Sequence, residues 1–553
     1  MNKLAATMDK VIDTNAKIDN MQVAEDICSL VKTSLGPLGA SKLIINAPER
    51  FTITGDGFSI MKNISSDAPA AKIIRGAAEA QKNEVGDGVK TTLILIGQLL
   101  ANANKLIHQI HQNIIIRGYD AAANKSIEVL ESLAVPFPVH SDEALEQVAA
   151  TAITSRSLLD VRKHFAEIAV RAVRKVAEGN GGEAHIDPDR ISTIKKIGGS
   201  LLDTELVNGL ALRKNASRPW MVSRVEKAKI AVVGEAIKAS LGEKSSFGHS
   251  EITLKDAAMA KIYLNKEEAM LRDMVTKIVS SGANVVFCQK GIDERAEYML
   301  DKNGVMVVAN INEDEMEKIV AASGCKPVGV VDDLTPSVLG QAEVVERRKI
   351  EGEEILFLLG CREQKSITIF VRGPEENVVD EAEVNLIKAV KVASKFIGRR
   401  QVIPGGGASE IEIEKEVRRY AKNFPGAEQL AIEAFADSVR NIAAALSESA
   451  GMDPRDTVAA LRSRHVSGER FVGINLVQGV LGDMVKLGIV EPPDIKVHAF
   501  KVAKEVVRTL LRVDASISKR EREVARPKVP KAPPPEKKEE GIPVVVEKTE
   551  EEY

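Results

Sequence analysis

The chain has 553 residues, about three to four times the length of a typical domain, so we expect several domains. Its 76 Lys and Arg residues nearly balance 79 Asp and Glu residues, and the net charge of −3 argues against a protein that binds a polyanion such as nucleic acid. Aromatic residues are only 3% of the chain, so its core must consist mainly of Ala, Val, Ile and Leu, which favours closely packed helices.

Cysteine spacing and hydropathy indicate the compartment. The four cysteines, Cys28, Cys288, Cys325 and Cys361, are far apart in the sequence and form no CxxC motif, which is typical of free thiols in a reducing compartment. The N-terminal segment lacks an apolar signal core, and no run approaches the ~18 consecutive apolar residues of a membrane span. The sequence therefore predicts a cytoplasmic protein with no membrane partner.

The first third of the chain has the i, i+3, i+4 apolar spacing of buried helices, interrupted by two Gly-Asp-Gly turns. Gly55–Gly57 follows a short alternating run typical of a strand, and Gly86–Gly88 precedes an apolar run from Leu93 to Leu100. Glycines on both sides of an aspartate let the backbone approach a ligand while the carboxylate stays free to hold Mg²⁺ or polarise water. Taken singly, each segment is better explained as an ordinary turn.

Two other glycine-rich segments are candidates for close approach to a ligand. Ser34–Gly39 (SLGPLG) follows a predicted helix and could expose backbone N–H groups to phosphate oxygens. Gly405–Gly407 follows Ile403-Pro404 and is either a ligand contact or a hinge before the next helix.

The pattern changes in the middle of the chain. From about Ile230, short β-branched runs alternate with helical stretches, including a long helix over Lys266–Ser281, which is typical of a compact α/β domain. The final third returns to long helices, so the order suggests a domain inserted between two halves of an outer domain. Residues 519–553 are rich in Pro and charge, which predicts a disordered tail.

Eight segments, taken in chain order, resemble the signature blocks of the group II chaperonins, the family of the thermosome and of the eukaryotic cytosolic chaperonin. They are SLGPLG, ITGDGFSIM, EVGDGVKTT, NVVFCQKGIDERA, VRGPEENVVDEAE, IPGGGASEIE, GMDPRDTVAALR and GDMVKLGIVEPPDIK. The resemblance spans roughly residues 15–515. It implies a subunit of a stacked double-ring ATPase, homo- or hetero-oligomeric, that encloses non-native client proteins in a cycle using ATP and Mg²⁺.

The resemblance also implies an α/β multidomain chaperonin fold. Its parts would be a mainly helical equatorial domain (1–135 and 397–518), a small intermediate domain (136–208 and 361–396), and an α/β apical domain (209–360) whose helical protrusion at about 241–266 serves as a lid.

Site residues follow from the same resemblance, position by position. The loop around the nucleotide phosphates corresponds to Leu35, Gly36 and Pro37, and the carboxylate beside the attacking water corresponds to Asp56. The second nucleotide-binding turn consists of Gly86, Asp87, Gly88, Lys90 and Thr91, with Asp87 as the Mg²⁺ ligand. The ribose and base would lie by Gly406 and Glu491.

The chain departs from the family pattern where hydrolysis occurs. Family members usually carry an Asp in the helix after VVDEAE, and Lys388 holds that place. A charged lysine cannot accept a proton or orient water as a carboxylate does. The family's GDGTTT reads GDGVKT, so Val89 and Lys90 replace hydroxyl residues facing the phosphates, and Leu159 replaces a lysine that senses the γ-phosphate.

Helical periodicity offers a second interpretation of Lys388, as part of a solvated face with Glu381, Asn385 and Lys395. This interpretation also leaves no catalytic Asp. The departures favour a chaperonin subunit whose own ATP hydrolysis is impaired. Two alternatives stay open. One is a fully active ATPase that uses another carboxylate, and the other is a protein-binding scaffold outside a ring.

Overall fold

The computed structural model describes residues 10–13, 16–47, 50–66, 68–137, 141–179, 186–214, 216, 218, 220–239, 257–350, 352–361, 367–514 and 516–519. The chain forms two units, one of residues 17–513 and a small one made from both ends of the chain. In the small unit, β1 (Lys10–Asp13) pairs antiparallel with β18 (Ser516–Lys519). Residues 241–256 of the predicted protrusion and residues 520–553 of the predicted tail lie outside the described residues.

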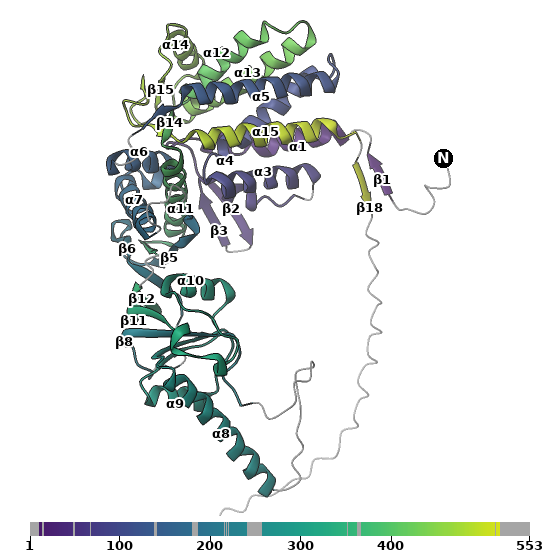
Figure 1. The fold of residues 1–553 in the computed structure, drawn as a ribbon. Helices are drawn as coiled ribbons and strands as arrows, with labels where there is room; N and C mark the ends of the chain where they lie inside the picture. Colours follow the sequence, from purple (N-terminus) through teal and green to yellow (C-terminus); the bar gives the residue numbers. More distant parts are fainter. Residues whose placement is uncertain are drawn as a thin grey trace, which may run out of the picture. The chain divides into compact units, whose positions relative to one another are not determined.

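Helices from both ends of the large unit share the first hydrophobic core (Figure 1). They are α1 (Ala16–Ser29), α2 (Gly57–Lys62), α3 (Pro69–Val85), α4 (Val89–Leu106), α5 (Gln112–Leu133), α12 (Ala408–Ala421), α13 (Ala427–Ser449) and α15 (Pro493–Arg512). The core is largely Ala, Ile, Leu and Val, as the composition predicts, and its few aromatic side chains include Phe435, stacked on Phe500 and edge-on to Tyr119.

A second core lies between three helices and a small sheet. The helices are α6 (Asp142–Ala152), α7 (Arg162–Gly179) and α11 (Glu376–Arg399), and the strands, in the order β5–β13–β6, are β5 (Ile191–Ile197), β13 (Ile367–Gly373) and β6 (Glu205–Val207). β13 runs parallel to β5 and antiparallel to β6. The chain between β7 and β12 forms the α/β part of the large unit.

A six-stranded sheet in the order β10–β9–β8–β11–β12–β7 forms that part. Its strands are β10 (Met306–Val308), β9 (Val285–Cys288), β8 (Arg224–Val233), β11 (Gly340–Ile350), β12 (Glu353–Cys361) and β7 (Gly209–Leu212). Successive residues of β8 and β9 face opposite sides, so two cores form. α10 (Glu313–Ser323) packs on one side, and α8 (Ala257–Ser280) and α9 (Glu294–Lys302) on the other (Figure 1). α8 begins nine residues before the helix predicted at Lys266.

Short elements connect these cores. The strands are β2 (Lys42–Ala47), β3 (Arg50–Thr54), β4 (Val135–Pro136), β14 (Gln401–Pro404), β15 (Val472–Asn475), β16 (Val480–Asp483) and β17 (Val490–Glu491), with the helix α14 (Pro454–Val466). Short 3₁₀ helices lie at Lys32–Ser34, Arg156–Leu158, Pro188–Arg190, Leu201–Asp203, Val331–Asp333 and Pro336–Val338.

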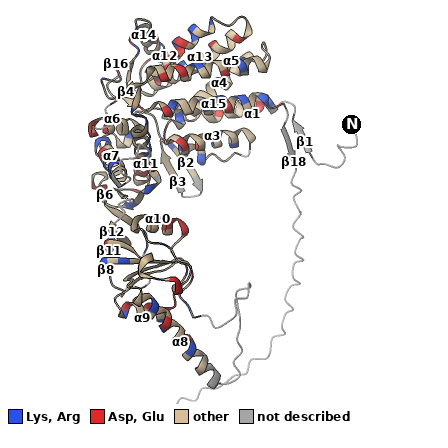
Figure 2. Ribbon diagram, in the orientation of Figure 1, with Lys and Arg blue, Asp and Glu red and all other residues tan. Residues whose placement is uncertain are grey.

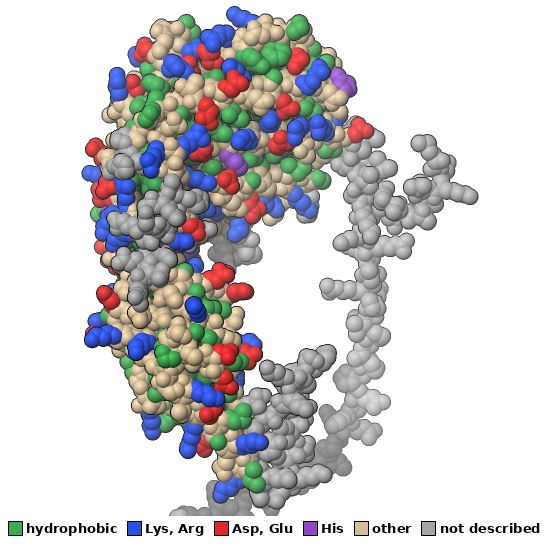
Figure 3. Space-filling view, in the orientation of Figure 1, with side chains coloured by type: hydrophobic (Ala, Val, Ile, Leu, Met, Phe, Trp, Pro, Cys, Tyr) green, Lys and Arg blue, Asp and Glu red, His purple; other side chains and the backbone are tan. Residues whose placement is uncertain are grey.

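Acidic and basic side chains are mixed along the described helices and strands (Figure 2), and the face drawn in Figure 3 carries both signs with apolar side chains in small groups. All four cysteines are buried and unpaired with one another, as the sequence predicts. Within the described residues, no helix combines the length and apolar character needed to cross a membrane.

Candidate functional site

A pocket of about 160 Å³ forms where glycine-rich segments from distant parts of the sequence meet. Most of the predicted site residues line it: Leu35, Gly36, Pro37, Asp87, Gly88, Lys90, Thr91, Gly406 and Glu491. Gly86, Asp56, Lys388 and Leu159 are not among the lining residues, and Val89 packs into the first core instead of facing the pocket.

Strand pairing brings the late segments to this pocket. Ile403 of β14 pairs with Glu491 of β17, and the N–H of Ile474 in β15 donates to the carbonyl of Gly406 at 2.8 Å. Gly406 has φ +58°, and a Cβ there would lie 2.6 Å from the Ile474 carbonyl oxygen. Only glycine fits this close approach without a shift of the backbone.

The N-terminal end of α4 opens on the same pocket. Gly88 is its N-cap with φ +81°, and no side chain caps the helix. The first N–H groups of a helix have no partner within it and carry partial positive charge, which suits an anion. Gly88, Lys90 and Thr91 line the pocket at this end.

Lys90 brings a buried positive charge to the same end of the pocket. Its side chain is 9% exposed, and Nζ donates to the Ser34 carbonyl at 2.6 Å. None of the ion pairs found among the described residues includes Lys90. Burial, aided by repulsion from Lys388, lowers the pKa of Lys90 to about 8.

Asp87 supplies a free carboxylate. Its backbone carbonyl accepts from Gln81 Nε2 at 2.9 Å, whereas no side chain or N–H in the described part of the chain donates to its carboxylate. No cluster of three His, Cys, Asp or Glu residues suited to a metal occurs in the described ranges. Mg²⁺ is commonly bound by one or two carboxylates plus substrate phosphates, so Asp87 could hold this ion only if phosphate oxygens supplied further ligands.

Lys496 joins two carboxylates that line the pocket with it. Its Nζ lies 2.9 Å from Glu410 Oε1 and 3.0 Å from Glu491 Oε1, and it is 5% exposed. Burial would lower the pKa of Lys496, but the two carboxylates outweigh it and raise that pKa. Burial raises the pKa of Glu491 although Lys496 opposes the shift. The sequence prediction missed Lys496 and Glu410, which sit inside two of the matched blocks.

Asp56 and Lys388 form a buried ion pair beside the pocket. Lys388 Nζ lies 2.5 Å from Asp56 Oδ1, with Asp56 4% and Lys388 8% exposed. The other oxygen, Oδ2, accepts from both the N–H and the hydroxyl of Ser59, each at 2.8 Å, so Asp56 is also the N-cap of α2. Both oxygens of Asp56 thus have partners within the protein.

The charges in this pair hold each other ionised. Burial alone would raise the pKa of Asp56, but the Lys388 ammonium and the Ser59 hydrogen bonds hold it well below its ordinary value of 3.8. Burial would lower the pKa of Lys388, and the attraction of Asp56 and Asp87 raises it instead. Lys388 is therefore a charged donor that cannot accept a proton from water.

The prediction of a solvated face on α11 is wrong for Glu381, Asn385 and Lys388, whereas the Lys395 side chain is 37% exposed. Glu381, Asn385 and Lys388 are each less than 10% exposed. Glu381 accepts from Gly55 N at 3.3 Å and from Ser157 Oγ at 3.0 Å, and Asn385 Oδ1 accepts from Thr154 N at 3.3 Å. The polar face is buried because segments distant in the sequence pack on it and satisfy its hydrogen bonds.

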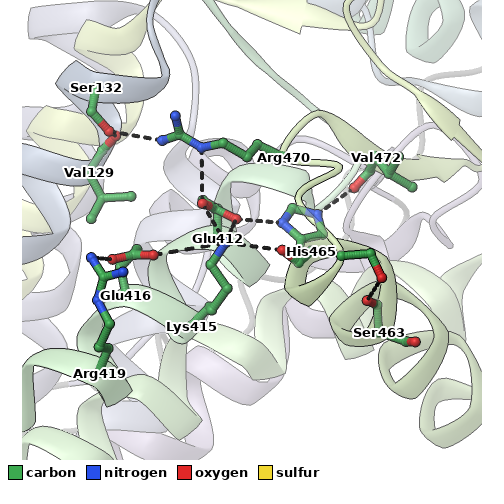
Figure 4. A network of polar contacts seen from close by, with 11 residues as sticks. Val129, Ser132, Glu412, Lys415, Glu416, Arg419, Ser463, His465, Arg470 and Val472 are labelled. Carbon is green, nitrogen blue, oxygen red and sulfur yellow. Dashed lines mark hydrogen bonds and ion pairs between the residues drawn. The ribbon is translucent and has the colours of Figure 1, made fainter. Parts of the chain in front are cut away.

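A buried network around Glu412 supports β15, one wall of the pocket (Figure 4). Glu412 Oε2 accepts from His465 Nδ1 at 2.8 Å, and Oε1 accepts from Arg470 Nε at 3.1 Å, while Lys415 Nζ lies 2.8 Å from both oxygens. His465 Nε2 lies 2.8 Å from the carbonyl of Val472, the first residue of β15. His465 thus links Glu412 to β15 through its two ring nitrogens.

We expect Glu412→Gln to lower the free energy of unfolding at pH 7 by about 2 kcal/mol, less than for a fully buried pair because Lys415 and Arg470 reach solvent. Burial would raise the pKa of Glu412, but its cationic partners lower it to about 2 from 4.5. Its contribution is therefore present above pH 4.5 and is lost as the pH falls toward 2. Urea unfolding measures the change.

The matched control is Glu416→Gln, which removes a neighbouring, less buried carboxylate and should cost under about 1 kcal/mol. Equal losses for the two variants, or no loss for Glu412→Gln, would contradict a supporting role for the network.

Comparison with known proteins places the chain in a family. A family model described as the TCP-1/cpn60 chaperonin family matches residues 27–521. The chain is 39% identical over 513 residues to a thermosome subunit of Methanopyrus kandleri, covering 93% of each chain. It is 40% identical over 510 residues to thermosome subunit alpha of Archaeoglobus fulgidus and to thermosome subunit beta of Thermococcus kodakarensis, covering 92% of this chain and 93% of each relative. The chain therefore belongs to the TCP-1/cpn60 chaperonin family and is a group II chaperonin subunit.

Proposed function

We propose that this subunit binds and encloses unfolded proteins within a double-ring chaperonin, binds ATP at the glycine-rich pocket, and hydrolyses that ATP poorly. The observation that carries the proposal is the ion pair between Lys388 Nζ and Asp56 Oδ1 at 2.5 Å. Its partners would be sister subunits in the rings and non-native client proteins.

We also propose that the three domains predicted from the sequence divide this function among them. Residues 1–135 and 397–518 would form the equatorial domain that holds the nucleotide, 136–208 and 361–396 the intermediate domain, and 209–360 the apical domain that meets clients. In support, helices from the first and last parts of the chain share one core.

Nucleotide roles follow from the lining of the pocket. Leu35–Pro37, the N-terminal end of α4 and Lys90 would face the phosphates, with Gly406 and Glu491 at the ribose and base. Asp87 would hold Mg²⁺ together with the phosphates, and the bound ion would neutralise part of their charge. An uncapped helix end and a buried ammonium both favour a polyanionic group here.

We expect poor hydrolysis because the buried carboxylates beside the pocket already have partners within the protein. Attack by water needs a group that orients the water and accepts its proton. Asp56 is occupied by Lys388 and Ser59, and Glu381 by Gly55 and Ser157. An active enzyme would need another carboxylate, for which Asp87, with no donor to its side chain, is the candidate.

Three measurements on the purified chain test this function: ATP hydrolysis with Mg²⁺, equilibrium binding of ATP, and particle size. We expect ATP to bind and turnover to be far below that of an active thermosome subunit assayed in parallel. Equal turnover would overturn the impairment, and absence of ATP binding would overturn the nucleotide site. A monomer that gains no mass with sister subunits would favour a scaffold outside a ring.

A further inference from the structure

Lys90 is a buried cation that forms no direct ion pair with any residue the structure describes. Its side chain is 9% exposed and its only hydrogen bond to a described residue is to the Ser34 carbonyl. Burying an ammonium group away from water is unfavourable unless an anion or several acceptors compensate it. The described part of the chain supplies one carbonyl oxygen, so two of the three N–H groups of Lys90 are left for a ligand.

The fold makes room for this lysine at the pocket. A Cβ on Gly57, in the first Gly-Asp-Gly turn, would lie 2.7 Å from Lys90 Cγ, so the absence of a side chain at Gly57 lets the lysine stem lie there. Lys90 is also the second residue of α4, so its ammonium and the uncapped helix end lie at the same side of the pocket.

The other carboxylates that act on Lys90 or line the pocket, Asp87 apart, have partners within the protein. Asp56 is paired with Lys388, Glu381 accepts from Gly55 N and Ser157 Oγ, and Glu410 and Glu491 share Lys496. Asp87 is the carboxylate lining the pocket, in the described part of the chain, that no ion pair engages. A bare polyphosphate would therefore meet one carboxylate, Asp87, and two cations, Lys90 and Arg162, that no ion pair among the described residues engages; Arg162 Nε donates to the Ala150 carbonyl.

We propose that Lys90 supplies the positive charge that a divalent cation ordinarily brings to nucleotide phosphates, so that this pocket binds a nucleoside diphosphate or triphosphate without Mg²⁺. The inference rests on the proposed nucleotide site. Lys90 acts as a fixed, charge-assisted hydrogen-bond donor, and Asp87 then contributes to metal binding without being required for nucleotide binding.

The test is equilibrium binding of ADP to the full chain by calorimetry, once with Mg²⁺ and once with EDTA. We expect the wild-type dissociation constant to differ by less than about threefold between the two buffers, a difference well below 1.4 kcal/mol. In EDTA, Lys90→Met should weaken ADP binding by about 10- to 100-fold, the effect of losing a hydrogen bond to a charged group. Mg²⁺ should restore most of that loss.

Lys42→Met is the matched control, because Lys42 donates to Thr33 on the same segment of chain but does not line the pocket. It should leave both dissociation constants unchanged. Lys90→Thr, which introduces the family's residue, provides a second variant if the methionine variant folds poorly.

Each outcome bears on a different claim. Wild-type binding of ADP with Mg²⁺ but not in EDTA would overturn the inference and leave the nucleotide site standing. Absence of binding in both buffers would overturn the proposed nucleotide site and this inference with it. Equal losses for the Lys90 and Lys42 variants would show that overall charge, not the position of Lys90, governs affinity.

Discussion

Replacing Lys388 with aspartate is expected to raise the rate of ATP hydrolysis by about 10²- to 10⁴-fold, the usual contribution of a positioned general base. The change removes the cation that occupies Asp56 Oδ1 and places a proton acceptor at the same point of α11. Two carboxylates would then face each other in a buried site, which is unfavourable without a cation between them. The gain should therefore depend steeply on Mg²⁺, and steady-state hydrolysis at several Mg²⁺ concentrations measures it.

Lys388→Asn is the matched control, since it removes the ammonium without adding a base. We expect it to show no comparable gain. If the aspartate and asparagine variants hydrolyse ATP equally fast, release of Asp56 rather than a new carboxylate explains the effect. If neither variant gains activity, the block lies elsewhere, with Lys90 and Leu159 as the remaining departures from the family pattern.

Much of the pocket could be predicted because its residues lie in local motifs. Turn chemistry marks Gly36, Gly88 and Gly406, each with positive φ, and the pocket collects all three segments. The backbone conformation of such a turn is set by its own residues, so the turn can be recognised in the sequence without knowledge of distant contacts.

The environment of Lys388 could not be predicted in the same way. Periodicity places Glu381, Asn385 and Lys388 on the polar face of a helix, and a polar face is normally solvated. Gly55, which donates to Glu381, and Asp56, which pairs with Lys388, lie more than 300 residues earlier in the chain. The local pattern therefore contains no information about these two partners. The buried Glu412 escaped notice for the same reason, because its partners His465 and Arg470 follow in later elements.

Substituting Lys388 by methionine is expected to destabilise the contact between α11 and Asp56 at the N-terminal end of α2 by about 3 to 5 kcal/mol at pH 7, the usual cost of leaving one member of a buried ion pair alone. Methionine keeps most of the side-chain volume, so the loss measures charge rather than packing. Hydrogen exchange of peptides that cover α2 and α11 reports the local free energy of opening.

The pH dependence separates this electrostatic cause from a packing defect. In the wild type, the pKa of Asp56 is depressed, so its ionisation contributes stability above its ordinary value of 3.8, and that contribution is lost as the pH falls further. Without Lys388, burial should raise the pKa of Asp56, and the carboxyl can then be accommodated as the neutral acid at low pH. The deficit of Lys388→Met should therefore shrink between pH 7 and about pH 4. In the double variant Asp56→Asn/Lys388→Met, which has no buried charge at either position, the deficit should be smaller than in the single variant at pH 7 and nearly independent of pH. A deficit that stays constant with pH in the single variant would mean that Lys388 stabilises α11 through its aliphatic stem and not through Asp56.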